Sequence, residues 1–393
     1  MYIETIKVPA FLIISVLFTA CNNNKGEATD VLKKLYSTDS IAIQSFILNN
    51  DRDTTLKGSL GTTLRIYKNT FTDSIGQPVK GQINLEFKEV FSPVDFVLGN
   101  LTTTSNGQQL ESSGMVYLNA TINNKQLNIA EDKVIGVIVP RDNQDDKMQV
   151  YEGNKDSLGI NWINPRPILN EQIKRKEFEQ ISITWVRPEN SLVSEMPLIG
   201  DTLFDKYKNV QNDTIVLVNG RKVQMYKPVK IKFTIDTSKG NDLRFIQEVL
   251  SAKGTNMFIE DYNTNYIFSI KKLGWANIDK LYDDPRTKEV ELITSIENHS
   301  DFNTVYVSLI ISNKKMYIPG YKKMDNSYSF THNDQEKLSL PVGETATILA
   351  TGYKGDKPYF AIKKIRISEK QIISFKLLET TMEQLKVQLK KEI

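Results

Sequence analysis

Apolar and polar residues alternate through much of the chain. Apolar residues occupy every second position in residues 83–87, 116–122 and 305–311. A period of two is typical of β-strands, because successive residues of a strand face opposite sides of the sheet. Turn sequences such as Gly76-Gln77-Pro78 separate these segments. The pattern predicts a mainly β protein made of two to three antiparallel, sandwich-like domains.

Three segments favour helices over strands. Residues 171–179 form a charged stretch near prolines, and residues 242–252 carry apolar residues at helical spacing. Residues 380–393 combine an apolar stripe with lysines on another face. The apolar positions of this last segment are Met382, Leu385, Leu389 and Ile393. We expect a C-terminal amphipathic helix that docks on its own domain, because so short a helix is marginally stable alone in water.

The N-terminus carries a short apolar run over residues 8–20, preceded by Lys7. Thirteen residues are too few to span a bilayer, which takes about 20, but they match the hydrophobic region of a signal peptide. The run ends in Leu17-Phe18-Thr19-Ala20-Cys21, which resembles the bacterial lipobox. That resemblance implies cleavage between Ala20 and Cys21 and attachment of lipid to the Cys21 thiol. An ordinary secretory signal with an incidental cysteine is the alternative.

Several short sequence motifs further along the chain also resemble those of a known group of proteins. They occupy residues 61–66, 76–81, 104–107, 156–162 and 274–279. Their order is similar to that of bacterial envelope lipoproteins of the Bacteroidota type, whose function is uncharacterised. The resemblance implies a β-rich architecture and a place in the cell envelope, and it implies no catalytic residues.

The localisation follows from the residues after the lipobox. Asn22 takes the place of the aspartate that commonly retains lipoproteins at the inner membrane, so we expect the outer membrane. Glu27 and Asp30 are the acids near the anchor, which leaves open whether the protein faces the periplasm or the cell surface. The sequence divides into a signal peptide (1–20), a lipid-anchored tether (21–40), a β-sandwich domain (41–165), a second β-rich region with a short helix (166–296) and a C-terminal β-domain with the terminal helix (297–393).

Composition narrows the range of functions. Fifty basic and forty-seven acidic residues give a net charge of +3, so no nucleic-acid partner is expected. Cys21 is the one cysteine, which excludes a disulfide framework, and His299 and His332 are the only histidines. The sequence contains no phosphate-binding loop, dinucleotide-binding fingerprint or Gly-x-Ser-x-Gly. We therefore expect no metal, no cofactor and no catalytic residues.

The strongest ligand-binding candidates are Asp283 and Asp284, which follow Trp275 and Asp279. Paired carboxylates near an aromatic residue are typical of a glycosidase, but Asp-Asp-Pro-Arg is also ordinary turn chemistry. The acidic stretch 142–146 could bind calcium or form a solvated hairpin loop.

Tryptophans and lysines offer two further candidates. The tryptophans at 162, 185 and 275 could stack on a sugar or anchor a core. The lysine pairs at 314–315, 322–323 and 363–364 could bind acidic glycans or protect strand edges from pairing.

These observations favour a lipid-anchored cell-envelope protein that acts as a non-catalytic binding, scaffolding or assembly component. Its expected partners are the membrane, through the N-terminal lipid, and an envelope protein or glycan. The alternative is an envelope hydrolase acting on glycan or peptide, which would need convergent carboxylates in one concave pocket.

Overall fold

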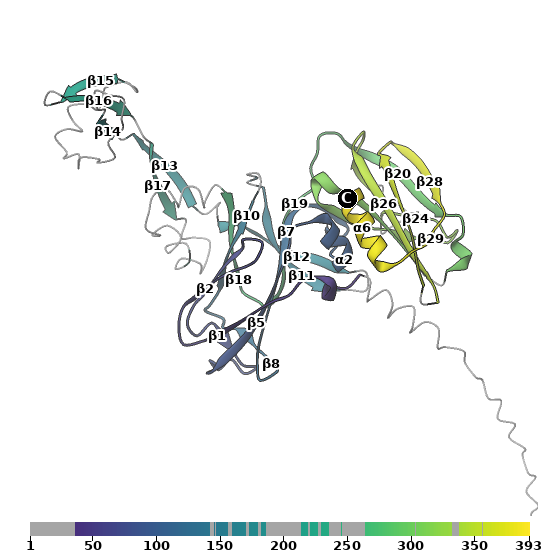
Figure 1. Cartoon of the computed structure of the whole chain (residues 1–393), viewed down its shortest axis with the longest axis horizontal. Coiled ribbons are helices and arrows are strands. Elements are labelled where there is room, and N and C mark those ends of the chain that lie inside the picture. Colours follow the sequence, from purple (N-terminus) through teal and green to yellow (C-terminus); the bar gives the residue numbers. More distant parts are fainter. Residues whose placement is uncertain are drawn as a thin grey trace, which may run out of the picture.

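The protein is mainly β, with sandwich-like domains and few helices, as the sequence predicts (Figure 1). The computed structural model describes residues 36–141, 145, 147–155, 159–169, 173–179, 182–185, 214–218, 221–226, 229–235, 245, 264–302, 304–331, 338–355 and 357–393. None of the helices in these ranges is long and apolar enough to cross a membrane.

The first sandwich is built on a large, mainly antiparallel sheet. Its order is β1 (Gln44–Asn49), β5 (Gln82–Val90), β7 (Gln108–Ile122), β19 (Gly274–Leu281), β11 (Gln149–Lys155) and β12 (Ile160–Pro167). The short strands β6 (Thr104–Ser105) and β8 (Lys125–Gln126) also pair with β7. Alternation is clear in β5, where Ile83, Leu85 and Phe87 are fully buried. The predicted period of two therefore marks the inner face of this sheet.

A second sheet covers that inner face. Its order is β18 (Asn265–Ile270), β10 (Ile135–Pro140), β3 (Thr63–Ile66) and β2 (Thr54–Lys57). A two-stranded ladder of β4 (Phe71–Thr72) and β9 (Asn128–Ile129) lies beside it. Leu64, Val137 and Phe268 of this sheet share a hydrophobic core with Leu85 and Leu118 of the larger one. Burial of this continuous core holds the two layers together.

The first sandwich is discontinuous in sequence. β18 pairs with β10, and β19 lies between β7 and β11. Both strands fall in the region expected over 166–296, but in the structure they complete the sheets of the domain expected over 41–165. Alternation identifies a strand but not its partner, because pairing depends on contacts between distant residues.

The second sandwich, here called the C-terminal sandwich, begins with β20, earlier than the expected boundary at residue 297. One sheet contains β23 (Tyr321–Lys322), β24 (Tyr328–Ser329), β20 (Thr287–Ile296) and β25 (Leu338–Pro341), with β28 (Lys370–Phe375) parallel to β20. The other contains β22 (Met316–Pro319), β21 (Val305–Ile311), β26 (Thr345–Lys354), β27 (Lys357–Arg366) and β29 (Leu378–Glu379). Leu292, Leu309 and Ile348 belong to the core between them.

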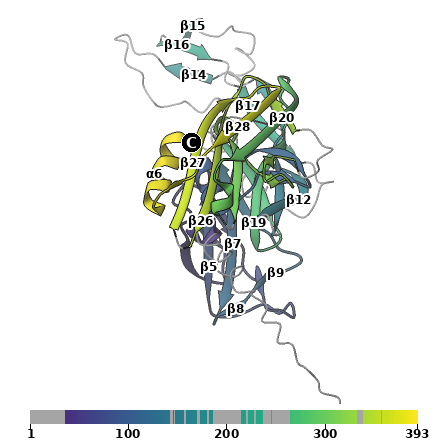
Figure 2. The ribbon, with the colours of Figure 1, turned by 90° about the vertical axis from the view of Figure 1, so that its right-hand side faces the viewer.

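The predicted C-terminal helix is present as α6 (Met382–Glu392) and contacts β27 (Figure 2). Thr381 caps its start: the Thr381 hydroxyl accepts from the Gln384 backbone, while the Gln384 side chain accepts from the Thr381 backbone. Leu385 and Leu389 are fully buried. The apolar stripe therefore docks on the chain's own domain, as its spacing indicates.

The two sandwiches share a hydrophobic cluster, here called the junction cluster. Its members from the first sandwich include Val94, Phe96 and Val97 of α2 (Pro93–Gly99), together with Leu110, Tyr151 and Trp162. Its members from the C-terminal sandwich include Tyr317, Leu349, Tyr353, Leu385 and Leu389. The backbone N–H of Tyr317 also donates to Thr103 Oγ1 at 2.9 Å. Apolar packing and hydrogen bonds thus join the domains directly.

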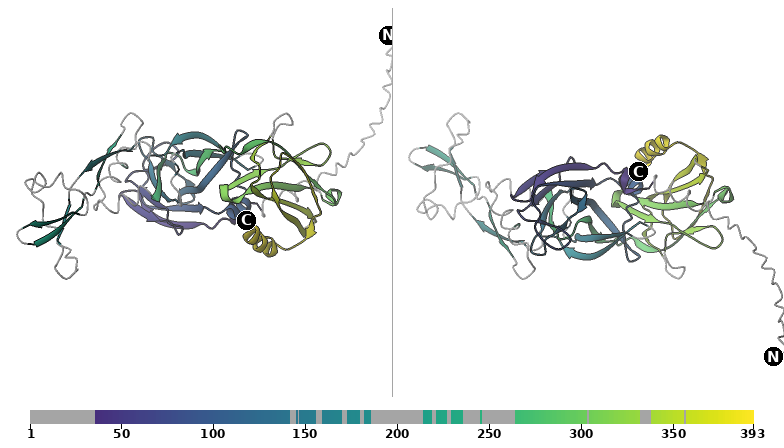
Figure 3. Two further views of the ribbon diagram at one scale, coloured as in Figure 1. Left: turned by 90° about the horizontal axis from the view of Figure 1, so that it is seen from above. Right: turned by 90° about the horizontal axis from the view of Figure 1, so that it is seen from below.

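A narrow set of strands extends from the first sandwich at the end away from the C-terminal sandwich (Figures 1 and 3). β13 (Ile173–Glu179) pairs with β17 (Val229–Ile235) as a two-stranded ribbon. Beyond it, β14 (Ser182–Trp185), β16 (Arg221–Tyr226) and β15 (Thr214–Val218) form a three-stranded sheet. We call these five strands the arm.

The helix expected over residues 171–179 is wrong, because residues 173–179 form strand β13. Seven residues of β13 pair in continuous register with β17, and this long-range pairing overrides local helix preference. The helix expected over 242–252 lies outside the described residues except for Phe245, which is helical and buried.

Candidate functional site

Trp275, the aromatic candidate, lies on β19 on the face of the sheet that borders the junction cluster. Its ring centroid is 5.1 Å from that of Tyr117 on β7. Gly153 on β11 lies beneath it, and a Cβ at that glycine would come 2.7 Å from the Trp275 Cβ. The glycine therefore lets the indole lie close to the strand, and the side chain is partly buried rather than projecting freely.

Trp162 is a core residue. It is fully buried, and its indole Nε1 donates to the carbonyl of Thr102 at 2.5 Å. A Cβ at Gly153 would also approach the Trp162 ring, so Trp162 and Trp275 pack around the same glycine. Trp185 lies on β14 in the arm. Of the three tryptophans, Trp162 fits the core-anchor interpretation.

Asp283 and Asp284 have different environments although they are adjacent. The Asp283 side chain is 77% exposed, and its carboxylate lies 3.4 Å from Lys147 Nζ. Asp284 is nearly buried and receives two hydrogen bonds from the Arg286 guanidinium, at 2.8 and 3.0 Å. The Arg286 backbone N–H also donates to Asp284, at 2.9 Å. The Asp-Asp-Pro-Arg sequence thus folds as a turn closed by its own arginine.

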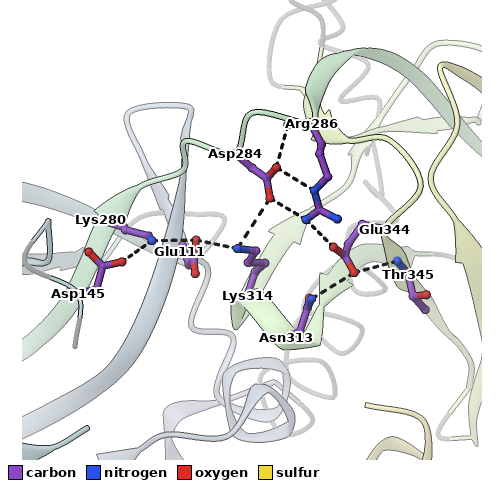
Figure 4. Close-up of polar contacts among 9 residues, drawn as sticks. All are labelled: Glu111, Asp145, Lys280, Asp284, Arg286, Asn313, Lys314, Glu344 and Thr345. Atoms are coloured by element: carbon purple, nitrogen blue, oxygen red, sulfur yellow. Dashed lines mark hydrogen bonds and ion pairs between the residues drawn. The ribbon is translucent and has the colours of Figure 1, made fainter. Parts of the chain in front are cut away.

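Asp284 is one member of a chain of ion pairs that crosses between the sandwiches (Figure 4). On the first sandwich, Lys280 Nζ lies 2.5 Å from Asp145 and 3.4 Å from Glu111. Lys314, in the 3₁₀ turn η5 (Ser312–Lys314) of the C-terminal sandwich, lies 3.5 Å from the same Glu111 carboxylate. Within this chain, the Glu111–Lys314 ion pair therefore connects the two sandwiches.

The chain continues within the C-terminal sandwich. Lys314 Nζ lies 3.8 Å from Asp284, and Arg286 bridges Asp284 to Glu344 at 2.8 Å. Asn313 Nδ2 donates to the other Glu344 oxygen at 3.1 Å. Each carboxylate in this series faces a cation, and each of the three cations faces two carboxylates.

This arrangement fixes the charges of its members. Hydrogen bonds from Arg286 lower the pKa of Asp284 to about 2. Burial alone would favour the neutral forms of Asp145 and Lys280, but their mutual hydrogen bond, further hydrogen bonds and neighbouring charges together outweigh it, so the pKa of Asp145 is lowered and that of Lys280 is raised. At neutral pH Asp284, Asp145 and Lys280 are therefore ionised.

Asp279 is the exception among the acids. It lies on β19 with no exposed surface; Oδ2 accepts from Asn277 Nδ2 at 2.5 Å, and Oδ1 has no hydrogen-bond partner. Ser112 Oγ in turn bonds Asn277 Oδ1 at 3.0 Å. Burial raises the pKa of Asp279 well above its usual range, which hydrogen bonding offsets only partly. The sequence places Asp279 near the candidate carboxylates, but the structure buries it beneath the junction rather than beside a surface.

The remaining candidates are also separated. His299 Nε2 lies 3.1 Å from the Tyr328 hydroxyl, and burial followed by the charge of Lys322 lowers the pKa of its imidazole. His332 lies outside the described residues, as does most of the acidic stretch 142–146. Within the described ranges, no group of three or more His, Cys, Asp or Glu residues could hold a metal ion.

The lysine pairs divide between different environments. Lys314 belongs to the ion-pair chain, and Lys315 Nζ donates to the carbonyl of Ser113 on the first sandwich at 3.4 Å. Lys364 pairs with Glu392 of α6 at 3.2 Å. The 314–315 pair therefore bridges the sandwiches, a role that sequence reasoning did not identify because the partners are about two hundred residues away.

No family model matches this chain, and no curated protein matches it.

Proposed function

We propose that this chain is a lipid-anchored protein of the bacterial cell envelope that serves as a non-catalytic binding, scaffolding or assembly component. The apolar run 8–20 and the lipobox ending in Ala20 and Cys21 support the anchor. One acyl chain holds a protein only marginally, whereas two or three hold it firmly, so a multiply acylated Cys21 would suffice without a spanning helix.

The ion-pair chain is the observation that carries the non-catalytic part of the proposal. General acid–base chemistry needs accessible groups whose pKa values are moved apart. Asp284 is held ionised by Arg286, while Asp279, whose pKa is raised, has no exposed surface. A substrate at the surface would meet the exposed Asp283 but neither the nearly buried Asp284 nor Asp279, which argues against the hydrolase alternative.

Placement at the outer membrane rests on the sequence after the anchor. Cys21 is followed by Asn22 rather than by a retention aspartate.

The experiment compares wild type, Cys21→Ala and the matched control Asn22→Ala in cells supplied with labelled fatty acid. Cys21→Ala should lose the label and leave the membrane fraction, while Asn22→Ala should keep both. Label retained in Cys21→Ala would contradict the anchor.

A separate assay addresses catalysis. The purified chain is incubated with a panel of polysaccharides and peptides beside Asp284→Asn and Asp279→Asn. We expect no turnover by any of them. Turnover that disappears in either folded variant would place the protein among the hydrolases.

A further inference from the structure

The large sheet of the first sandwich has a second face that points away from its core. The core residues of β5 and β7 occupy alternate positions, at 83, 85 and 87 and at 116, 118 and 120. Because alternate positions of a strand share one face, the residues between them point the other way. On these two strands they include Asn84, Glu86, Lys88, Tyr117 and Asn119. We call this side of the sheet the outer face.

One level of the outer face carries two aromatic rings side by side. Tyr117 of β7 lies opposite Trp275 of β19 on one side and opposite Lys88 of β5 on the other. The ring centroids of Tyr117 and Trp275 are 5.1 Å apart, with the planes tilted by 43°. Lys88 Nζ lies 5.7 Å from the centroid of the Tyr117 ring. A cation on one neighbouring strand and an indole on the other therefore hold the Tyr117 ring in place.

Both rings keep polar groups available to a ligand. The side chains of Tyr117 and Trp275 are only partly buried. Within the described ranges, neither the Tyr117 hydroxyl nor the Trp275 indole N–H makes a hydrogen bond. Tyrosine and tryptophan usually bond these groups when they serve as core anchors, as Trp162 does with Thr102. This pair therefore differs from a core pair.

The next levels of the outer face carry planar polar side chains. Glu86 lies opposite Asn119, and Asn119 Nδ2 donates to Glu86 Oε2 at 2.9 Å. Asn84, one level further from the rings, is exposed and lies opposite Thr121. Successive levels of one face are about 7 Å apart, so amide and carboxylate groups extend for about 14 Å from the aromatic pair.

We propose that the outer face binds a neutral glycan chain. One sugar ring would stack on Tyr117 and Trp275, and the hydroxyls of the neighbouring sugars would bond Glu86 and Asn119. Sugars suit this combination, because their C–H faces pack on aromatic rings while their hydroxyls bond amides and carboxylates. The inference names a ligand class for the proposed binding component and rests on that proposed function.

The charge of the outer face favours a neutral chain. Among the outward residues of these three levels on β5, β7 and β19, Glu86 and Lys88 are the charged ones, and they cancel. An acidic polymer or an anionic membrane would need a surplus of positive charge. Ile47 of β1, opposite Asn84, adds an exposed apolar side chain at the edge of the sheet. One such residue is too little for the apolar centre of a protein interface.

Two variants test the proposal. Trp275→Ala removes the larger ring and should lower the affinity for the bound glycan by about tenfold or more. Asn84→Arg lays a long side chain over the polar part of the face and should lower the affinity to a similar extent. Because Asn84 is exposed, this second variant should fold normally even if Trp275→Ala does not. The matched control is Ser339→Arg, at an exposed strand position of the C-terminal sandwich opposite Glu289, which should bind as wild type does.

Binding is measured by calorimetry on the purified full chain with cellohexaose, xylohexaose and mannohexaose. Polygalacturonate and unfolded casein are separate arms for an acidic polymer and a protein. We expect at least one hexasaccharide to bind, with an affinity that changes little with salt, because no net charge is neutralised.

Three results would overturn the proposal. The first is that wild type binds none of the hexasaccharides. The second is unaltered affinity in folded Trp275→Ala or, where that variant does not fold, in Asn84→Arg. The third is tighter binding of polygalacturonate or casein than of any hexasaccharide. The sugars are recovered and analysed for cleavage: cleaved sugar would contradict the proposed non-catalytic function, whereas intact sugar that does not bind would contradict this inference alone.

Discussion

The hydroxyl of Tyr36, at the start of the described chain, hydrogen-bonds the hydroxyl of Thr351 on β26, 315 residues later. The residues that follow Tyr36 are fastened to the first sandwich instead. Lys88 Nζ donates to the carbonyl of Thr38 at 2.7 Å, and Ser40 Oγ donates to the carbonyl of Leu98 at 2.9 Å. The last part of the segment expected as a tether is therefore hydrogen-bonded to both sandwiches near the junction cluster.

We expect Tyr36→Phe to destabilise the protein by removing the hydrogen bond to Thr351. The substitution keeps the ring and removes the hydroxyl, so the free energy of unfolding should fall by about 0.5–1.5 kcal/mol. Chemical denaturation of the full chain measures it. Tyr306→Phe is the control, because Tyr306 is an exposed tyrosine of the same C-terminal sandwich. An equal loss in both variants would show that the Thr351 contact contributes nothing specific.

Asp284 should stabilise the fold in a pH-dependent way. Its pKa is about 2 in the folded protein and about 3.9 when unfolded, so its stabilisation is present above pH 4 and is lost as the pH falls from 4 to 2. The difference in unfolding free energy between wild type and Asp284→Asn should shrink over that range. Urea unfolding at several pH values tests this. Asp283→Asn, at a 77% exposed position, should change stability little. A wild-type advantage that is constant down to pH 2 would contradict the ion pair.

Asp279 should have the opposite dependence. Burial raises its folded pKa, so its contribution to stability is fully present below the unfolded pKa of about 3.9 and is lost as pH rises toward the folded pKa. Asp279→Asn keeps a similar shape but cannot ionise, so it avoids the free-energy cost of burying a carboxylate at higher pH. The variant should therefore gain stability relative to wild type between pH 5 and pH 8, measured by urea unfolding. A relative loss over this range would mean that Asp279 is stabilised as a carboxylate.

The docking of α6 predicts a large difference between two positions of the helix. Leu389 is fully buried in the junction cluster, whereas Val387 is 66% exposed. Leu389→Ala should lower the free energy of unfolding by about 2–5 kcal/mol. Val387→Ala should change it by about 0.5 kcal/mol or less. Similar values for the two would show that the helix does not depend on its apolar stripe.

Local patterns predicted the elements that depend on local periodicity. Alternation identified β5, β7 and β21, and helical spacing identified α6 with the residues that it buries. In these segments burial on one face and backbone preference agree, so a single sequence is informative.

The same local patterns could not predict strand pairing or ion pairs between residues far apart in the sequence. Residues 173–179 are rich in charge and suit a helix, yet pairing with β17 makes them a strand. Glu111 and Lys280 carry no sequence signal, and Lys314 stands out only as one of a lysine pair; the three meet because β7 and β19 are neighbours and η5 lies across the junction. The candidate carboxylates and the nearby Arg286 are visible in the sequence, but the pairing of Asp284 with Lys314 and of Asp283 with Lys147 is not, since ion pairs between distant segments have no characteristic spacing.

The most direct test of the central claim, a lipid-anchored mature chain, is mass spectrometry of the N-terminal peptide of protein purified from its own cells. We expect a peptide that begins at Cys21 and carries diacylglycerol on its thiol and an acyl group on its new amino terminus. Alkaline hydrolysis should remove the ester-linked chains. A peptide that begins at another residue, or an unmodified Cys21, would contradict the account.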